Sequence, residues 1–245
     1  MKQLNFAISI AIIFLLTSCR SLMLDKELVY KTNQSMQLVD IGIKKNELLK
    51  SQFYPLGGVQ LKENIAVNIS VHDFSKSQFK IYQQAAKLQN KKVTLKYVDS
   101  LELKPVFIRV SVKDRVGVLK ALNSPTNLEL LNYIKSKPKS SIVMETAMVM
   151  PSQWMRECAN SKGLFIVTNN NGGLDLGMYL EDGNAQTISC SDATVFSYKK
   201  LSFCWGDNNK GAVILRNFVA QGTSCGKASS KKYENVVSNQ HSFKY

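Results

Sequence analysis

The chain has 245 residues, of which 44% are hydrophobic and 20% are charged, a composition that excludes a disordered or fibrous protein and suffices for a globular core. The formal net charge is +14, and residues 20–150 hold 21 Lys/Arg against 11 Asp/Glu, whereas residues 151–245 hold 10 against 7. Such an excess favours polyanionic partners: lipid phosphates, acidic polysaccharide or nucleic acid. The alternative is a lysine-rich, solvated surface without a specific site.

The first nineteen residues have the pattern of an export signal. Lys2 precedes an apolar run from Phe6 to Leu16, which is shorter than the roughly 20 residues of a membrane span. The run ends in Leu16-Thr17-Ser18-Cys19, which resembles the lipobox of bacterial lipoproteins. This resemblance covers residues 1–19 only. It implies that the Cys19 thiol receives a diacylglyceryl group, that residues 1–18 are removed and that the new amino terminus is acylated. The alternatives are an ordinary signal peptide with an incidental cysteine and an uncleaved anchor.

The resemblance also implies a location. Two or three acyl chains hold a protein stably on a bilayer, whereas one chain holds it only marginally. Arg20 stands where, by resemblance to enterobacterial lipoproteins, an Asp would favour inner-membrane retention. We therefore expect an outer-membrane lipoprotein that faces the periplasm. Its expected partners are the membrane and an anionic envelope glycan or lipid, or another envelope protein. Nucleic acid is not expected, because an exported lipoprotein rarely meets it, and no cofactor is expected.

The first two thirds of the mature chain alternate between strand and helix patterns. Residues 19–34 are polar and mixed, which predicts a tether, and residues 35–245 are predicted to form one domain with a candidate sub-boundary near 150–163. Residues 54–58 are predicted to be a turn or loop. Apolar alternation predicts strands over 38–43, 65–71, 93–98, 106–112 and 142–150, and helical spacing predicts helices over 73–90, 114–122, 126–137 and 152–160.

The last third is predicted to be a series of strands separated by turns. These strands are expected over 164–168, 174–181, 186–190, 194–204 and 212–220. The sequence therefore predicts an α+β fold. It would have a mixed or antiparallel sheet, a few helices in the N-terminal two thirds, and a disulfide-linked β-meander at the C-terminus.

Four cysteines follow Cys19, and an even number in an exported protein predicts disulfides; they are Cys158, Cys190, Cys204 and Cys225. A hairpin of strands 194–204 and 212–220 about a turn at 207–209 would place position 190 opposite position 225. Position 204 would then lie about 30 Å away along the strand. We therefore predict Cys190–Cys225 with Cys158–Cys204. No metal site is expected, because no C-x-x-C occurs and both histidines are distant in sequence.

Basic residues surround the predicted strand-to-helix junction near residue 113. They form a candidate anion-binding face, or else a solvated face, and comprise Arg109, Lys113, Arg115 and Lys120, with Lys135, Lys137 and Lys139 as further members. In the strand over 106–112, Arg109 is expected on the face that is either wet or covers an anion.

A second candidate site is catalytic. Gly222-Thr223-Ser224-Cys225-Gly226 matches G-x-S-x-G, and Glu234 and His241 follow in the order of a Ser-acid-His triad. A nucleophile elbow requires a parallel sheet and room between triad members, yet Ser224 and His241 are only 17 residues apart. The sequence therefore favours a non-catalytic lipoprotein that binds or scaffolds an envelope component. A periplasmic serine hydrolase using Ser224 is the alternative.

Overall fold

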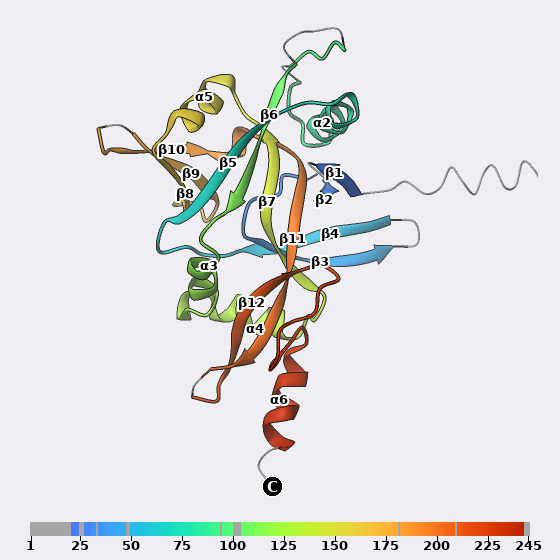
Figure 1. The fold of residues 1–245 in the computed structure, drawn as a ribbon, viewed down its shortest axis with the longest axis vertical. Coiled ribbons are helices and arrows are strands. Elements are labelled where there is room, and N and C mark those ends of the chain that lie inside the picture. The colour runs from blue at the N-terminus through green and yellow to red at the C-terminus, as the bar shows by residue number, and fades with distance from the viewer. Residues whose placement is uncertain are drawn as a thin grey trace, which may run out of the picture.

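The structure is a computed structural model that describes residues 21–242 apart from 25–26, 33, 48–49, 94, 100–103, 181 and 209. Its strands join in one sheet (Figure 1). In chain order they are β1 (Ser21–Leu24), β2 (Glu27–Lys31), β3 (Asp40–Glu47), β4 (Lys50–Gly58), β5 (Ile65–Asp73), β6 (Val106–Val112), β7 (Ser140–Val149), β8 (Gly163–Thr168), β9 (Leu174–Tyr179), β10 (Ala185–Ser189), β11 (Thr194–Asp207), β12 (Val213–Ala220) and β13 (Ser229–Ser230).

Helices cover parts of this sheet. They are α2 (Lys76–Leu88), α3 (Arg115–Leu122), α4 (Leu128–Lys135), α5 (Ser152–Asn160) and α6 (Tyr233–Ser242), with short 3-10 turns η1 (Pro125–Asn127) and η2 (Cys190–Asp192). The strand pairs of the described residues are antiparallel. The predicted α+β fold is therefore confirmed.

Strands β7 and β11 lie at the centre of the sheet. The strand order is β1-β2-β11-β7-β6-β5-β8-β9-β10, with β3 and β4 branching from β7, and β12 and β13 from β11. One edge of β7 pairs with two strands, since Ser141 lies opposite Gly42 of β3 and Met148 lies opposite Ile108 of β6. Because β7 is covered on both faces, nearly all its residues are buried, which explains the apolar run that predicted a central strand.

An aromatic cluster holds α2 against one face of the sheet. The helix begins after Ser75, whose hydroxyl accepts from the backbone N–H of Gln78 while the Gln78 side chain accepts from the Ser75 N–H, a capping box. Phe74 contacts Phe107 of β6 and Phe196 of β11, with ring centroids 4.8 and 5.5 Å apart. These aromatic contacts bury one face of the helix.

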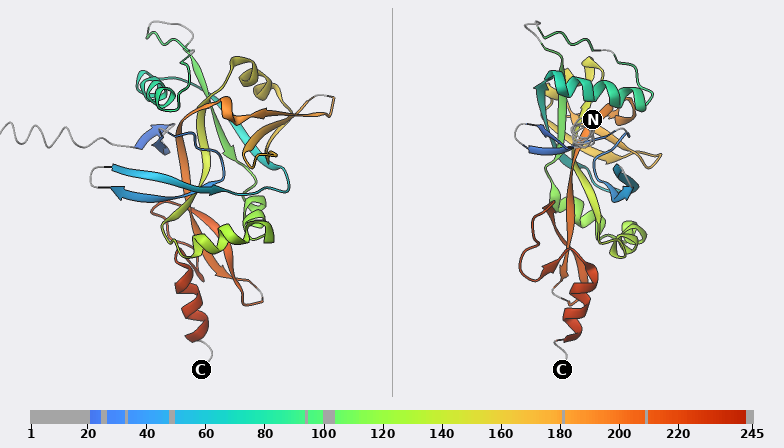
Figure 2. Two further views of the ribbon diagram at one scale, coloured as in Figure 1. Left: turned by 180° about the vertical axis from the view of Figure 1, so that it is seen from behind. Right: turned by 90° about the vertical axis from the view of Figure 1, so that its right-hand side faces the viewer.

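Helices α3 and α4 lie toward the other end of the sheet (Figures 1 and 2). Asp114 caps α3 by accepting from the backbone N–H of Gly117 at 2.8 Å. Val118 and Leu122 of α3 and Ile134 of α4 belong to the main apolar core. The predicted boundaries of these helices, and of α5, differ from the observed ones by a few residues at most.

Several sequence-based expectations are wrong. Residues 21–24 and 27–31, predicted to lie in the tether, form the paired strands β1 and β2, and β2 pairs with β11 through Lys31 and Ser197. Residues 54–58, predicted to be a turn, lie in β4. The described residues of the predicted strand 93–98 have no strand partner. They lie along α2 instead, where the ring of Tyr97 stacks on Phe79 at 5.3 Å.

The structure also corrects the predicted disulfides. Cys204 is bonded to Cys225, with Cα atoms 5.8 Å apart, whereas Cys158 and Cys190 are free thiols. The β11–β12 turn lies at 208–212, where the Asn208 carboxamide oxygen accepts from two backbone N–H groups. The observed register of the β11–β12 hairpin therefore differs from the predicted register.

The chain also reverses direction after β12. Ser230 of β13 pairs opposite Trp205 of β11. This return brings Cys225 next to Cys204, which the hairpin geometry alone does not predict.

Candidate functional site

Arg109 has a different role from the predicted one. Its side chain is only 12% exposed and pairs with Glu145 on the neighbouring strand β7. The Arg109 Nε lies 2.9 Å from Glu145 Oε1. The face of β6 that carries Arg109 also carries Phe107, which packs under α2. Because this face is covered by protein, Arg109 is not part of a solvent-facing anion site.

Of the remaining members of the predicted basic face, Lys135 and Lys137 are half-buried and the others are exposed. Lys113 follows β6, while Arg115 and Lys120 lie on α3. The Asp114 carboxylate lies between the first two in sequence, where it caps the helix. These three residues do not line any hollow described in the structure. They remain a predicted anion-binding set.

The structure does not assemble the predicted catalytic group. Ser224 lies in an exposed loop between β12 and β13, and Glu234 lies exposed on α6. The side chain of His241 is outside the described residues. A nucleophile elbow requires a sharp turn from a strand into a helix, whereas this loop leads into a second antiparallel strand. The hydrolase alternative gains no support from this geometry.

A lysine-lined groove lies where β3 and β11 both pair with the first residues of β7; the three strands are labelled in Figure 1. Its volume is about 580 Å³, within the range of ligand sites. Four lysines from four separate segments line it, and three serines lie between them; the lysines are Lys44, Lys139, Lys200 and Lys231, and the serines are Ser140, Ser141 and Ser202. We call this site the lysine groove.

The register of the paired strands places the residues that form the floor of the lysine groove. Ser141 of β7 lies opposite Gly42 of β3 on one side and Ser202 of β11 on the other. Opposed residues project to the same face, as do residues two apart along a strand. Lys200 and Lys44 therefore share that face with Ser141.

The described residues that line the lysine groove carry charge of one sign. No Asp or Glu is among the described residues that line it. Lys200 is only 6% exposed, and its Nζ lies 5.1 Å from the ring centroid of Phe53, a favourable cation–π contact. Burial, with a smaller contribution from Lys44, lowers the pKa of Lys200 to about 8. Lys200 is therefore mostly protonated at pH 7, although its charge is costly to bury.

Ser140 and Ser141 differ in the hydrogen bonds that their hydroxyls make. Ser140 donates its hydroxyl to the Lys137 carbonyl, whereas Ser141 is 5% exposed and its hydroxyl has no hydrogen-bond partner among the described residues. A buried hydroxyl without a partner is unfavourable. The Ser141 hydroxyl therefore lies in the protein interior beneath the lysine groove and not at its surface.

Most residues of the lysine groove do not stand out in the sequence. Only Lys139 was among the basic residues singled out, because the others come from distant parts of the chain. Two local signals were present: Ser140-Ser141 at the start of an apolar strand, and Lys199-Lys200 within another. Polar residues at strand positions that are otherwise buried are a signature of a site.

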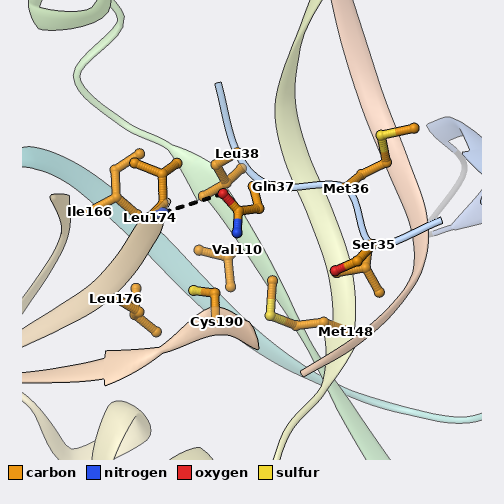
Figure 3. A pocket seen from close by; sticks show the side chains of 11 residues that line it. Ser35, Met36, Gln37, Leu38, Val110, Met148, Ile166, Leu174, Leu176 and Cys190 are labelled. Atoms are coloured by element: carbon orange, nitrogen blue, oxygen red, sulfur yellow. Dashed lines mark hydrogen bonds between the residues drawn. The ribbon is translucent and has the colours of Figure 1, made fainter. Parts of the chain in front are cut away.

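A second hollow is apolar and small. Figure 3 shows Val110, Met148, Leu174 and Cys190 around a space of about 20 Å³, which is room for about one water molecule. The Gln37 side chain closes part of it by accepting from the Leu174 N–H at 3.2 Å. Burial raises the pKa of the Cys190 thiol to about 11, so it is a poor nucleophile at neutral pH.

No protein-family model and no curated protein matches the chain. Within the part of the chain that the structure describes, no helix is both long and apolar enough to cross a membrane. The same residues contain no cluster of three or more His, Cys, Asp or Glu side chains that could hold a metal ion.

Proposed function

We propose that this chain is a lipid-anchored lipoprotein of the cell envelope that binds an anionic envelope component and catalyses no reaction. The observation that carries this proposal is the lysine groove. Four ammonium groups converge there, and no carboxylate of the described residues lines it. The net charge of +14 supports the same conclusion, because it attracts anions over the whole surface.

The resemblance to a lipobox supports a lipid anchor, and Arg20 after Cys19 supports a place in the outer membrane, facing the periplasm. The Cys204–Cys225 disulfide is compatible with that compartment, because disulfides persist outside the reducing cytosol. In this location the anionic partners within reach are envelope glycans and lipids. Cys19 itself lies outside the described residues.

We expect Cys19 to carry the lipid. Metabolic labelling with an alkyne fatty acid should mark the wild-type chain, and Cys19→Ala should remove the label because the acceptor thiol is gone. Cys19→Ala should also move the protein from the membrane fraction to the soluble fraction or to its uncleaved precursor. A label that survives the substitution would refute the lipidation.

We expect the lysine groove to carry the anion binding. The lipidated protein in a neutral detergent should bind inorganic pyrophosphate in isothermal titration calorimetry. Joint replacement Lys44→Glu, Lys139→Glu and Lys231→Glu should weaken binding about tenfold or more, since three charges change sign. Added salt should weaken it too, because the Debye length is about 10 Å at 0.1 M.

The matched control changes the same number of charges outside the lysine groove, with Lys113→Glu, Arg115→Glu and Lys120→Glu. This second triple variant should keep most of the affinity. If it loses more affinity than the first, the anion site lies at the start of α3, as the sequence predicted. If neither variant differs from wild type, or if nothing binds, the proposed function fails.

A further inference from the structure

Lysines dominate helix α2 and the segment that follows it. Residues 76–98 contain six lysines and no Asp or Glu. Two of these lysines have partners within the protein, since Lys76 pairs with Asp99 and Lys91 donates to the Ser191 carbonyl. The other four are exposed, and they are Lys80, Lys87, Lys92 and Lys96. This part of the surface therefore carries a strong positive charge.

Apolar side chains are exposed among these lysines. Leu88 at the end of α2 is 58% exposed, and Val93 and Val98 after it are 37% and 50% exposed. A group of exposed apolar and basic side chains is typical of a surface that contacts a membrane. We call the four exposed lysines and these three apolar residues the α2 face.

Helix α2 lies beside the first strands of the chain (Figures 1 and 2). Ser21, the first residue of β1, lies opposite Tyr30 of β2, and Tyr30 lies opposite Tyr198 of β11. Two residues before Tyr198, Phe196 packs beneath α2, with its ring centroid 6.2 Å from that of Tyr82. The start of β1 and helix α2 therefore lie on the same side of the molecule.

The proposed lipid anchor brings a bilayer to this side of the molecule. Cys19 is joined to Ser21 through Arg20 alone, and two residues of fully extended chain span about 7 Å. Because β1 begins at Ser21, the spacer between a lipidated Cys19 and the sheet is short. A bilayer that holds the acyl chains must then lie close to β1 and hence to α2.

We propose that the α2 face is a membrane-docking surface that lies on the bilayer in which Cys19 is anchored. Leu88, Val93 and Val98 enter the boundary between the headgroups and the acyl chains, and the lysines of the α2 face contact the phosphates of anionic phospholipids. This inference rests on the lipid anchor of the proposed function and does not involve the lysine groove. It predicts that the domain has one preferred orientation on the membrane.

Quenching of tryptophan fluorescence by brominated phospholipids tests this contact. The lipidated protein is placed in vesicles of dibromophosphatidylcholine with or without about 30% phosphatidylglycerol, and the wild type gives the baseline of the native tryptophans. Leu88→Trp should lose at least about half of its added fluorescence in the anionic vesicles, because its ring reaches the brominated chains. Leu128→Trp is the matched control and should keep its added fluorescence, since Leu128 is 51% exposed but lies on α4, far from α2 in every view (Figures 1 and 2).

Two triple variants of the Leu88→Trp protein test the role of charge. The first removes three charges of the α2 face, with Lys80→Gln, Lys87→Gln and Lys92→Gln. The second removes three charges near α3, with Lys113→Gln, Arg115→Gln and Lys120→Gln. All six side chains are exposed, so both variants should fold. In the anionic vesicles the first should reduce the quenching at least about twofold, because fewer charges hold the α2 face on the lipid phosphates, and the second should leave it unchanged.

Flotation of the vesicles separates the docking from the anchor. If the protein floats with the vesicles and the quenching at position 88 depends on the lysines of the α2 face, the proposal is supported. If the protein floats but position 88 is quenched no more than position 128, or equally in both triple variants, the inference is overturned while the lipid anchor stands. If the protein does not float with any vesicle, the anchor of the proposed function fails, and the inference fails with it.

Discussion

Arg109→Met is expected to lower the free energy of unfolding by about 3 kcal/mol, because it leaves the Glu145 carboxylate inside the sheet without its cation. The two side chains are only 12% and 14% exposed, so water can solvate the remaining charge only in part. Urea denaturation at pH 7, followed by circular dichroism, would measure the change as a lower midpoint at constant slope.

Two controls define this result. Lys76→Met breaks an ion pair with Asp99, in which both side chains are more than half exposed, and should change the midpoint little because surface pairs contribute little. The double variant Arg109→Met, Glu145→Leu should recover much of the lost stability, because no charge then remains buried. If Arg109→Met has no more effect than Lys76→Met, the pair does not stabilise the sheet.

The sequence predicted the elements that have a clear period. Residues 106–112 have apolar side chains at every second position and form β6 over that range, and residues 152–160 form α5 as predicted, directly after Pro151. The prediction was wrong at β4, where Pro55 and two glycines suggested a turn but the residues form a strand. β4 pairs with β3 alone, and an edge strand tolerates a proline because one side makes no ladder hydrogen bonds.

The hydrophobic period of a strand also does not show which parts of the protein cover each of its faces. Arg109 alternates with apolar residues and therefore points away from Ile108 and Val110, as predicted. Whether that face meets water depends on α2 and on Glu145 of β7, which are distant in sequence. For the same reason the sequence pattern does not reveal the lysine groove, whose lysines meet only when β3, β7 and β11 pair. Pairing between distant strands is information that local patterns do not contain.

Removing the Cys204–Cys225 disulfide is also expected to have a large effect. The bonded residues are 21 positions apart, and closing a loop of that length reduces the entropy of the unfolded chain by an amount that corresponds to about 3 kcal/mol. Cys225→Ser should therefore lower the free energy of unfolding by about that amount in urea denaturation. Cys190→Ser, which removes a thiol that makes no cross-link, should cost less. A reducing agent should destabilise the wild type but not the Cys225→Ser variant.

The disulfide should matter for anion binding too. The loop that it fixes leads through β13 to Lys231, on the wall of the lysine groove, and on to Tyr233, whose ring packs edge-on against Trp205 at 5.3 Å. Without the cross-link this return segment is held by the short pairing of β13, by the contacts of Tyr233 with Trp205 and Lys135, and by the burial of Val236 in the core. We therefore expect Cys225→Ser to weaken pyrophosphate binding several-fold under conditions where the sheet remains folded. Non-reducing peptide mapping provides the direct check: it should recover Cys204 joined to Cys225. Recovery of Cys190 joined to Cys225 would instead restore the hairpin register predicted from the sequence and remove this explanation for how Lys231 is held.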